Sequence, residues 1–172
     1  MIRRRLLPLA VLLALAPAAA GCGGDDKAST PTTAATQGTS TAASTATYQT
    51  QVQTILTSVG TAGSTLGTAA QASSSSADIA TALEKFQASV KQAADELSKL
   101  TAPAKAQTGQ DELEQVLREI ADGVQPSIDA AKANDRTKFT TTFKAYQAKL
   151  DGAYRDRLTA AGAKIDKALA GQ

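Results

Sequence analysis

The sequence contains no histidine and no tryptophan, and only one cysteine and one methionine among its 172 residues. Without histidine there is no imidazole base, no Ser-His-Asp or Cys-His arrangement, and no ordinary zinc or non-haem iron site. A single cysteine cannot close an intrachain disulfide or hold an iron–sulfur cluster. Aromatic residues make up only 3% of the chain, so any core must be aliphatic and rich in alanine. We therefore predict no metal and no cofactor.

The N-terminus has the three parts of a secretory signal peptide. The arginines Arg3–Arg5 precede an apolar run, Leu6–Ala16, and the small residues Ala18–Gly21 follow it. The apolar run has the length of a signal-peptide core and is too short for a membrane span of about 20 residues. We expect residues 1–21 to be removed from the mature protein. The strongly apolar run favours the general secretory route, although the arginines weakly resemble a twin-arginine signal.

The only cysteine follows this segment directly, in the sequence Ala19-Ala20-Gly21-Cys22. This sequence resembles the lipobox of bacterial lipoproteins, from which it departs at Ala19, where leucine is usual. The resemblance implies cleavage between Gly21 and Cys22 and a diacylglyceryl group on the Cys22 thiol. Fatty acyl chains such as palmitate would then hold the protein at the extracytoplasmic face of the cell membrane. The alternative is an ordinary signal cleaved after Ala20, with Cys22 incidental.

Residues 22–47 are predicted to form a disordered linker rich in serine, threonine and alanine, as in actinobacterial lipoproteins. The segment 23–47 contains no valine, isoleucine, leucine or aromatic residue. It therefore cannot bury enough apolar surface to offset the entropy lost on ordering. A flexible coil of this length has a root-mean-square reach of about 25–30 Å, which would separate a domain from a membrane surface.

From residue 48 onward apolar residues recur every three or four positions, and this helical period is sustained four times. Breaks rich in serine, proline or asparagine separate the four runs. We predict an all-α domain over residues 48–172, an antiparallel up-down four-helix bundle. The expected helices cover roughly residues 48–71, 77–101, 104–133 and 135–170.

Capping residues mark two of these helix starts. Ser75 or Ser76 can cap the second helix, and Asn134 or Asp135 can cap the fourth. Pro103 suits the first turn of the third helix better than the interior of the second.

Two features predict irregular helices. Pro126, which follows Gly123, lacks an amide donor and should kink or split the third helix. In the fourth run, Leu150, Tyr154 and Leu158 step by four twice. Such a stutter should unwind the supercoil locally.

The first helix is the least regular because Gly60, Gly63 and Gly67 lie within it. Each glycine destabilises a helix interior by about 0.8–1 kcal/mol relative to alanine. One interpretation is a marginal helix that tertiary packing stabilises. The other is a seam of small residues that lets another helix, or an apolar ligand, approach closely.

Charged residues are predicted to lie on solvent-facing helix surfaces. Four pairs have the four-residue spacing of intrahelical ion pairs, namely Lys91–Asp95, Asp95–Lys99, Glu114–Arg118 and Asp151–Arg155. The third helix carries the only acidic cluster, and Glu112 and Glu119, seven residues apart, are expected to face water. A buried carboxylate pair for glycosidase chemistry is therefore not predicted.

The three tyrosines fall on apolar seams and should pack with their hydroxyls at the rim. They are Tyr48, Tyr146 and Tyr154.

The charge balance gives no support for a nucleic-acid partner. The formal charge of +2 includes three arginines of the signal, and the mature chain from residue 22 has 15 cations and 16 anions. The basic residues of the fourth helix alternate with acids and lack interleaved exposed aromatics.

Together these features predict a non-enzymatic interaction or scaffold module, lipid-anchored at the cell envelope through Cys22, with an envelope protein as partner. The alternative is an envelope carrier or sensor that binds a small apolar ligand between the helices.

Overall fold

The computed structural model describes residues 38–72 and 75–171, with side chains from residue 45 onward and without that of Ala72. Gly21, Cys22 and the predicted signal and linker up to residue 37 lie outside the described residues. The described part is helical and contains no strand. Its helices are α1 (Gly38–Ala72), α2 (Ser76–Ser98), α3 (Gln107–Gly123), α4 (Gln125–Lys132), α5 (Arg136–Lys149), the π-helical turn η1 (Leu150–Tyr154) and α6 (Arg155–Ala170).

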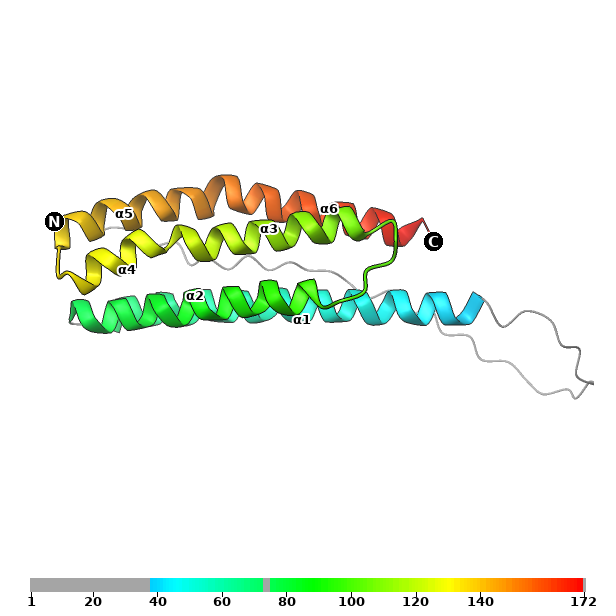
Figure 1. The fold of residues 1–172 in the computed structure, drawn as a ribbon, viewed down its shortest axis with the longest axis horizontal. Helices are drawn as coiled ribbons and strands as arrows, with labels where there is room; N and C mark the ends of the chain where they lie inside the picture. Colours follow the sequence, from blue (N-terminus) through cyan, green and yellow to red (C-terminus); the bar gives the residue numbers. More distant parts are fainter. Residues whose placement is uncertain (1–37, 73–74, 172) are drawn as a thin grey trace, which may run out of the picture. The chain divides into compact units, whose positions relative to one another are not determined.

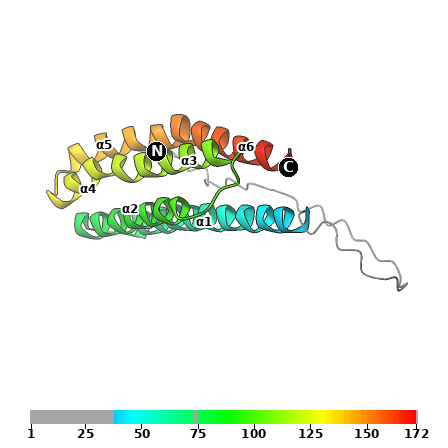
Figure 2. The same cartoon turned by 45° about the vertical axis from the view of Figure 1, so that its right-hand side comes forward.

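These helices form four antiparallel rods, which confirms the predicted up-down four-helix bundle. α1 and α2 are the first two rods, α3 with α4 is the third, and α5, η1 and α6 run on as the fourth (Figure 1). α1 packs along α2, α2 along α3 and α4, and the third rod along the fourth. α1 makes at most marginal contact with the other rods. Figure 2 shows the α1–α2 pair lying beside the pair of rods formed by α3–α6.

α1 begins ten residues before the expected start at residue 48, because the expected linker end, residues 38–47, is helical. The periodicity of apolar residues gave no sign of this extension, since the segment contains none of the larger apolar residues. Its alanines are nevertheless strong helix formers. Within the described ranges, no helix is both long and apolar enough to cross a membrane.

The predicted caps are present. Ser75 has extended backbone angles, and its side chain accepts a hydrogen bond of 3.1 Å from the amide of Asp78 at the start of α2. Asp135 caps α5 in the same way through the amide of Lys138, at 2.9 Å. Asn134, two residues after the end of α4, has a positive φ of 54°. The amide of Asp135 reaches back to the carbonyl of Ala130, which is the hydrogen bond of a Schellman motif.

Both predicted irregularities occur. The third rod breaks between α3 and α4 at Val124, which places Pro126 in the first turn of α4, where a missing amide donor costs little. The fourth rod contains the π turn η1 at Leu150–Tyr154, the position of the stutter. A π turn takes up one extra residue, so Tyr154 stays on the core side of the rod. Pro103 lies in the turn before α3 rather than in its first helical turn.

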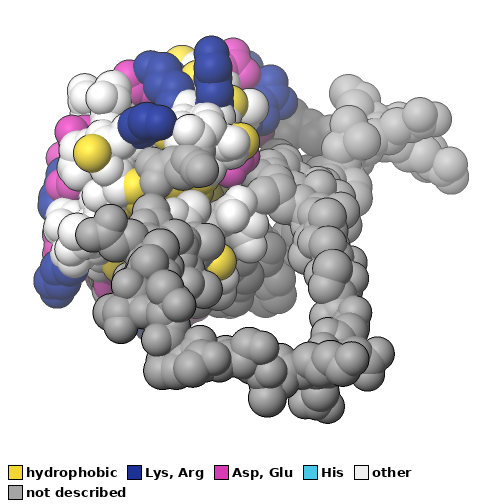
Figure 3. Space-filling view, turned by 90° about the vertical axis from the view of Figure 1, so that its right-hand side faces the viewer, with side chains coloured by type: hydrophobic (Ala, Val, Ile, Leu, Met, Phe, Trp, Pro, Cys, Tyr) yellow, Lys and Arg dark blue, Asp and Glu magenta, His cyan; other side chains and the backbone are white. Residues whose placement is uncertain are grey.

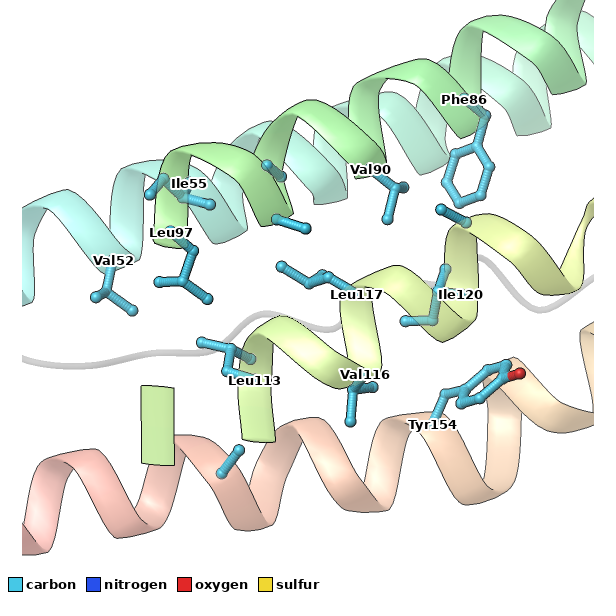
Figure 4. Packing of buried hydrophobic residues seen from close by; sticks show 14 of the residues in the cluster. Val52, Ile55, Phe86, Val90, Leu97, Leu113, Val116, Leu117, Ile120 and Tyr154 are labelled. Atoms are coloured by element: carbon cyan, nitrogen blue, oxygen red, sulfur yellow. The ribbon is translucent and has the colours of Figure 1, made fainter. Parts of the chain in front are cut away.

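The core is aliphatic, as the composition predicts. In Figure 4, Val52 of α1, Leu97 of α2 and Leu117 of α3 point into the space between these rods. Val116 of α3 points instead toward the fourth rod, which carries Tyr154. The largest side chains that are completely or almost completely buried are Leu83, Leu97, Leu113, Leu117, Ile128, Val90, Val116, Val124 and Ser127. All of these larger side chains belong to the second and third rods or to the break between α3 and α4. The rods α2 and α3–α4 are therefore the centre of the fold.

Candidate functional site

Two carboxylates of α3 form ion pairs that join it to the fourth rod. Glu119 binds the guanidinium of Arg157 on α6 through two hydrogen bonds, and Glu112 binds Lys164, also on α6. The prediction that Glu112 and Glu119 face water together was wrong, because both are half-covered by α6. In each helix the paired residues are seven apart, so the two bonds fix the antiparallel register of α3 and α6.

The electrostatics of Glu119 favour its charged form. The hydrogen bond from Arg157 is the largest influence and lowers the pKa of Glu119, and it raises the pKa of Arg157. A general acid in a glycosidase requires a raised carboxyl pKa. The arrangement around Glu119 is thus suited to holding two helices together rather than to delivering a proton.

A second set of ion pairs joins α2 to the third rod. Arg118 lies 3.1 Å from Asp95 of α2 and 2.9 Å from Glu114 of its own helix, so the predicted pair Glu114–Arg118 is confirmed. Lys91 lies 3.6 Å from Asp122 of α3. Lys91 and Asp95 therefore bind α3 instead of each other. All these side chains are at least partly exposed, so each pair is worth at most about 1 kcal/mol.

The end of the bundle at which the chain finishes shows cationic and anionic side chains interspersed, without a large area of one sign (Figure 3). In the middle of the fourth rod, Arg155 lies 3.6 Å from the neighbouring Asp156, not beside the predicted partner Asp151. Within the described ranges, no group of three acidic, cysteine or histidine side chains is placed to hold a metal ion.

The three tyrosines are buried on the seams, as predicted, but their hydroxyls do not lie at the rim. The Tyr146 hydroxyl donates to the carbonyl of Ile120 at 3.1 Å, and the Tyr154 hydroxyl donates to that of Glu119 at 3.3 Å. The Tyr48 hydroxyl is buried and has no hydrogen-bond partner among the residues that the structure describes. Burial, assisted by the charge of Asp111, raises the pKa of Tyr48 to about 12.

An open groove lies between α1 and α2, with a volume of about 520 Å³. Apolar side chains, among them Ala62, Leu66 and Phe86, line it together with hydroxyl groups. Asp78 and Lys85 stand in the wall that α2 contributes. A second recess of about 220 Å³ lies between the start of α2, the end of α4 and the start of α5. Neither recess was predicted, because each depends on which helix faces pack together.

The glycines of α1 do not bring α2 closer. A side-chain carbon added at Gly60 or Gly67 would meet no atom within 4 Å, and one at Gly63 would be 4.0 Å from Phe86. The close approach in the bundle occurs instead at Gly109 of α3, where an added carbon would lie 2.8 Å from Ile165. The free surface beside Gly60 and Gly67 is compatible with the predicted seam for another helix.

Comparison with known proteins gives no match to a family model, a curated protein or a solved structure. The functional argument therefore depends on the residues and the geometry of this chain alone.

Proposed function

We propose that the protein is a lipid-anchored, non-enzymatic interaction module at the extracytoplasmic face of the cell membrane. The observation that carries the proposal is the position of the only cysteine, Cys22, directly after a three-part signal sequence. Two acyl chains would anchor the protein stably, since each buried methylene contributes about 0.8 kcal/mol. The linker would then hold the bundle above the membrane surface.

The chemistry of the bundle supports an interaction role. Three acidic residues of α3, Glu112, Glu119 and Asp122, are engaged in ion pairs with neighbouring rods. Its exposed faces differ strongly in character, from the charged surface of α3–α6 to the uncharged surface of α1. Distinct, rigid helix faces of this kind are suited to recognising other helices or protein surfaces.

The carrier or sensor hypothesis receives no comparable support. It requires an apolar space between the helices. The groove between α1 and α2 instead opens to solvent and has Asp78, Lys85 and several hydroxyl groups on its walls. Such a lining favours a protein surface as occupant over a small apolar molecule.

The anchor is tested by Cys22→Ala, with Ser29→Ala in the linker as the matched control. The wild type and Ser29→Ala should partition with membranes, and intact-mass measurement should show cleavage before Cys22 and an added diacylglyceryl group. Cys22→Ala should accumulate as an uncleaved precursor or a soluble protein. A Cys22→Ala protein that is cleaved normally and still retained in the membrane would disprove the lipid anchor.

The interaction role is tested by mild crosslinking in membranes, followed by detergent extraction and recovery of the protein. We expect crosslinked species larger than the monomer that Cys22→Ala does not form when it is released from the membrane. Recovery of the monomer alone over a range of crosslinker concentrations would contradict the proposed role.

A further inference from the structure

The exposed surface of α1 carries no charge. Residues 28–77 contain no aspartate, glutamate, lysine or arginine, and α1 lies entirely within this stretch. Each of six threonines on α1 donates its hydroxyl to the backbone carbonyl four residues earlier, at 2.8–3.1 Å: Thr50, Thr54, Thr57, Thr61, Thr65 and Thr68. Another surface can therefore cover α1 without burying an unpaired charge and without leaving these hydroxyl donors unsatisfied.

The groove beside this surface has a regular construction. On each helix four of the six lining residues follow steps of four, three and four, which keep to one helix face. They are Ser58, Ala62, Thr65 and Ala69 on α1 and Asp78, Ala82, Lys85 and Ser89 on α2, and Thr61, Leu66, Thr81 and Phe86 complete the lining. The alanines in this pattern leave room for side chains of another helix between the larger lining residues.

The only charged residues in the groove lining are one acid and one base on the same wall. Asp78 and Lys85 are seven residues apart, about 10 Å along the axis of α2. Within the described part of the chain neither forms an ion pair, and Asp78 accepts a hydrogen bond of 2.6 Å from Ser75. An antiparallel copy of this wall would place each acid opposite a base. Ala82, a small residue, lies close to the midpoint between them.

We propose that this groove is the interface of a two-fold symmetric homodimer, in which the α2 helices of two copies run antiparallel. Asp78 would lie opposite Lys85 of the partner subunit, and Lys85 opposite Asp78 of the partner subunit. A two-fold interface must be complementary to itself, and an acid and a base arranged about a small central residue satisfy that requirement. The uncharged flank of α1 adds no repulsion between like charges. This inference rests on the proposed interaction role and names a second copy of the chain as partner.

The geometry is tested by cysteine crosslinking of the full-length protein in membranes. Ala82→Cys, near the two-fold axis, should form a disulfide-linked dimer on mild oxidation. Ala88→Cys, an exposed position on the same helix outside the groove lining, is the matched control. The wild-type chain, whose sole cysteine is Cys22, controls for crosslinking through that residue.

Charge reversal tests complementarity. Lys85→Asp, or Asp78→Lys, replaces both attractive pairs of the dimer with repulsive ones. Either change should raise the dimer dissociation constant about tenfold, measured by sedimentation of the full-length protein in detergent. The double variant Asp78→Lys/Lys85→Asp should recover the wild-type value, and circular dichroism should show unchanged helicity in all variants. Lys144→Asp, an exposed reversal on α5, should leave dimerisation unchanged.

The interface would be established if three results were obtained together. Ala82→Cys forms the crosslink, adding Lys85→Asp abolishes it, and adding both charge reversals restores it. Equal crosslinking through Ala88→Cys, or a dimer indifferent to both charge reversals, would overturn it. A strictly monomeric protein that still crosslinks to a different envelope protein would also overturn the homodimer while leaving the proposed function intact. If the wild-type protein formed the homodimer but carried no lipid, the homodimer would stand and the proposed anchor would be wrong.

Discussion

The α1–α2 pair and the α3–α6 pair are built from the same helical period but are held together in different ways. α3 and α6 approach closely at Gly109, where an added side-chain carbon would lie 3.1 Å from the carbonyl of Ala161, and two ion pairs fix their register. α1 has no charged residue, and its glycines Gly60 and Gly67 face open space. Beyond Ile55 its apolar residues are only partly buried.

The difference indicates where stability and where interaction reside. A fully packed interface with matched charges has little capacity to accept a new partner without losing contacts it already has. A rod that packs on one neighbour, and that has an uncharged exposed surface, can gain contacts by binding. We therefore infer that α2–α6 supply most of the folding stability and that α1, together with the groove face of α2, supplies the recognition surface.

The most severe test of this division compares leucines in the two regions. Leu117 of α3 is completely buried, whereas Leu66 of α1 is only partly buried. Leu117→Ala should lower the free energy of unfolding by about 3–4 kcal/mol, because it loses buried surface and leaves a cavity. Leu66→Ala should lower it by about 1 kcal/mol, in proportion to the smaller area buried. Urea unfolding followed by circular dichroism measures both, and equal losses would refute the division.

Glycine substitutions probe the same contrast with a single methyl group. Gly109→Ala places a carbon against Ile165 and against the backbone of α6, and should destabilise the protein by about 1–3 kcal/mol. Gly60→Ala meets open space in a helix interior and should stabilise by about 0.5–1 kcal/mol. Thermal unfolding of the two variants should therefore shift in opposite directions. A stabilising Gly109→Ala would show that α3 and α6 are less closely packed than described.

Tyrosine hydroxyls give a third comparison. Tyr146→Phe removes a buried hydrogen bond to Ile120 and should destabilise by about 0.5–1.5 kcal/mol. Tyr48→Phe removes a buried hydroxyl that has no partner in the described part of the chain, and it should be neutral or slightly stabilising. A destabilising Tyr48→Phe would show that this hydroxyl has a partner after all.

The same tyrosines predict a loss of stability in alkali. Because burial raises the pKa of Tyr48 from 10.0 to about 12, the neutral phenol is favoured in the folded state. This contribution is fully present below the unfolded-state pKa and is lost as pH rises toward 12. Burial also raises the pKa of Tyr146. The unfolding free energy of Tyr48→Phe should consequently fall less between pH 10 and 12 than that of the wild type, with tyrosinate absorbance as an independent readout.

Local features of this fold were predictable because they depend on a few neighbouring residues. Each of the following features is determined by residues within one or two helical turns: the caps at Ser75 and Asp135, the break before Pro126 and the distorted turn at the Leu150 stutter. The start of α1 at Gly38 was missed because alanine-rich helix without large apolar residues has no periodic signal.

Contacts between rods were not predictable, because each depends on the register of two helices. Lys91 and Asp95 have the spacing of an intrahelical pair, yet both bind α3. The groove could not be predicted for the same reason, because its lining depends on how α1 and α2 are rotated relative to each other. The lipid attachment at Cys22 does not depend on how two helices are aligned, and it remains a prediction from the signal sequence.

The smallest expected effect concerns the ion pair between Glu119 and Arg157. The hydrogen bond from Arg157 lowers the pKa of Glu119, so the folded state favours the carboxylate. This contribution to stability is present above the unfolded-state pKa of about 4.3 and is lost as pH falls through the lower folded-state value. Glu119 is 37% exposed, so solvent screening limits the effect to less than about 1 kcal/mol.

Glu119→Gln should therefore reduce the unfolding free energy at pH 7 and have almost no effect once the carboxylate is protonated in the wild type. Its matched control is Glu96→Gln, which removes an exposed carboxylate bonded to Gln92 of its own helix. Urea unfolding at neutral and acidic pH measures the difference between the two variants. If both respond to pH alike, the ion pair adds nothing to the α3–α6 interface, and its stability comes from the close packing at Gly109.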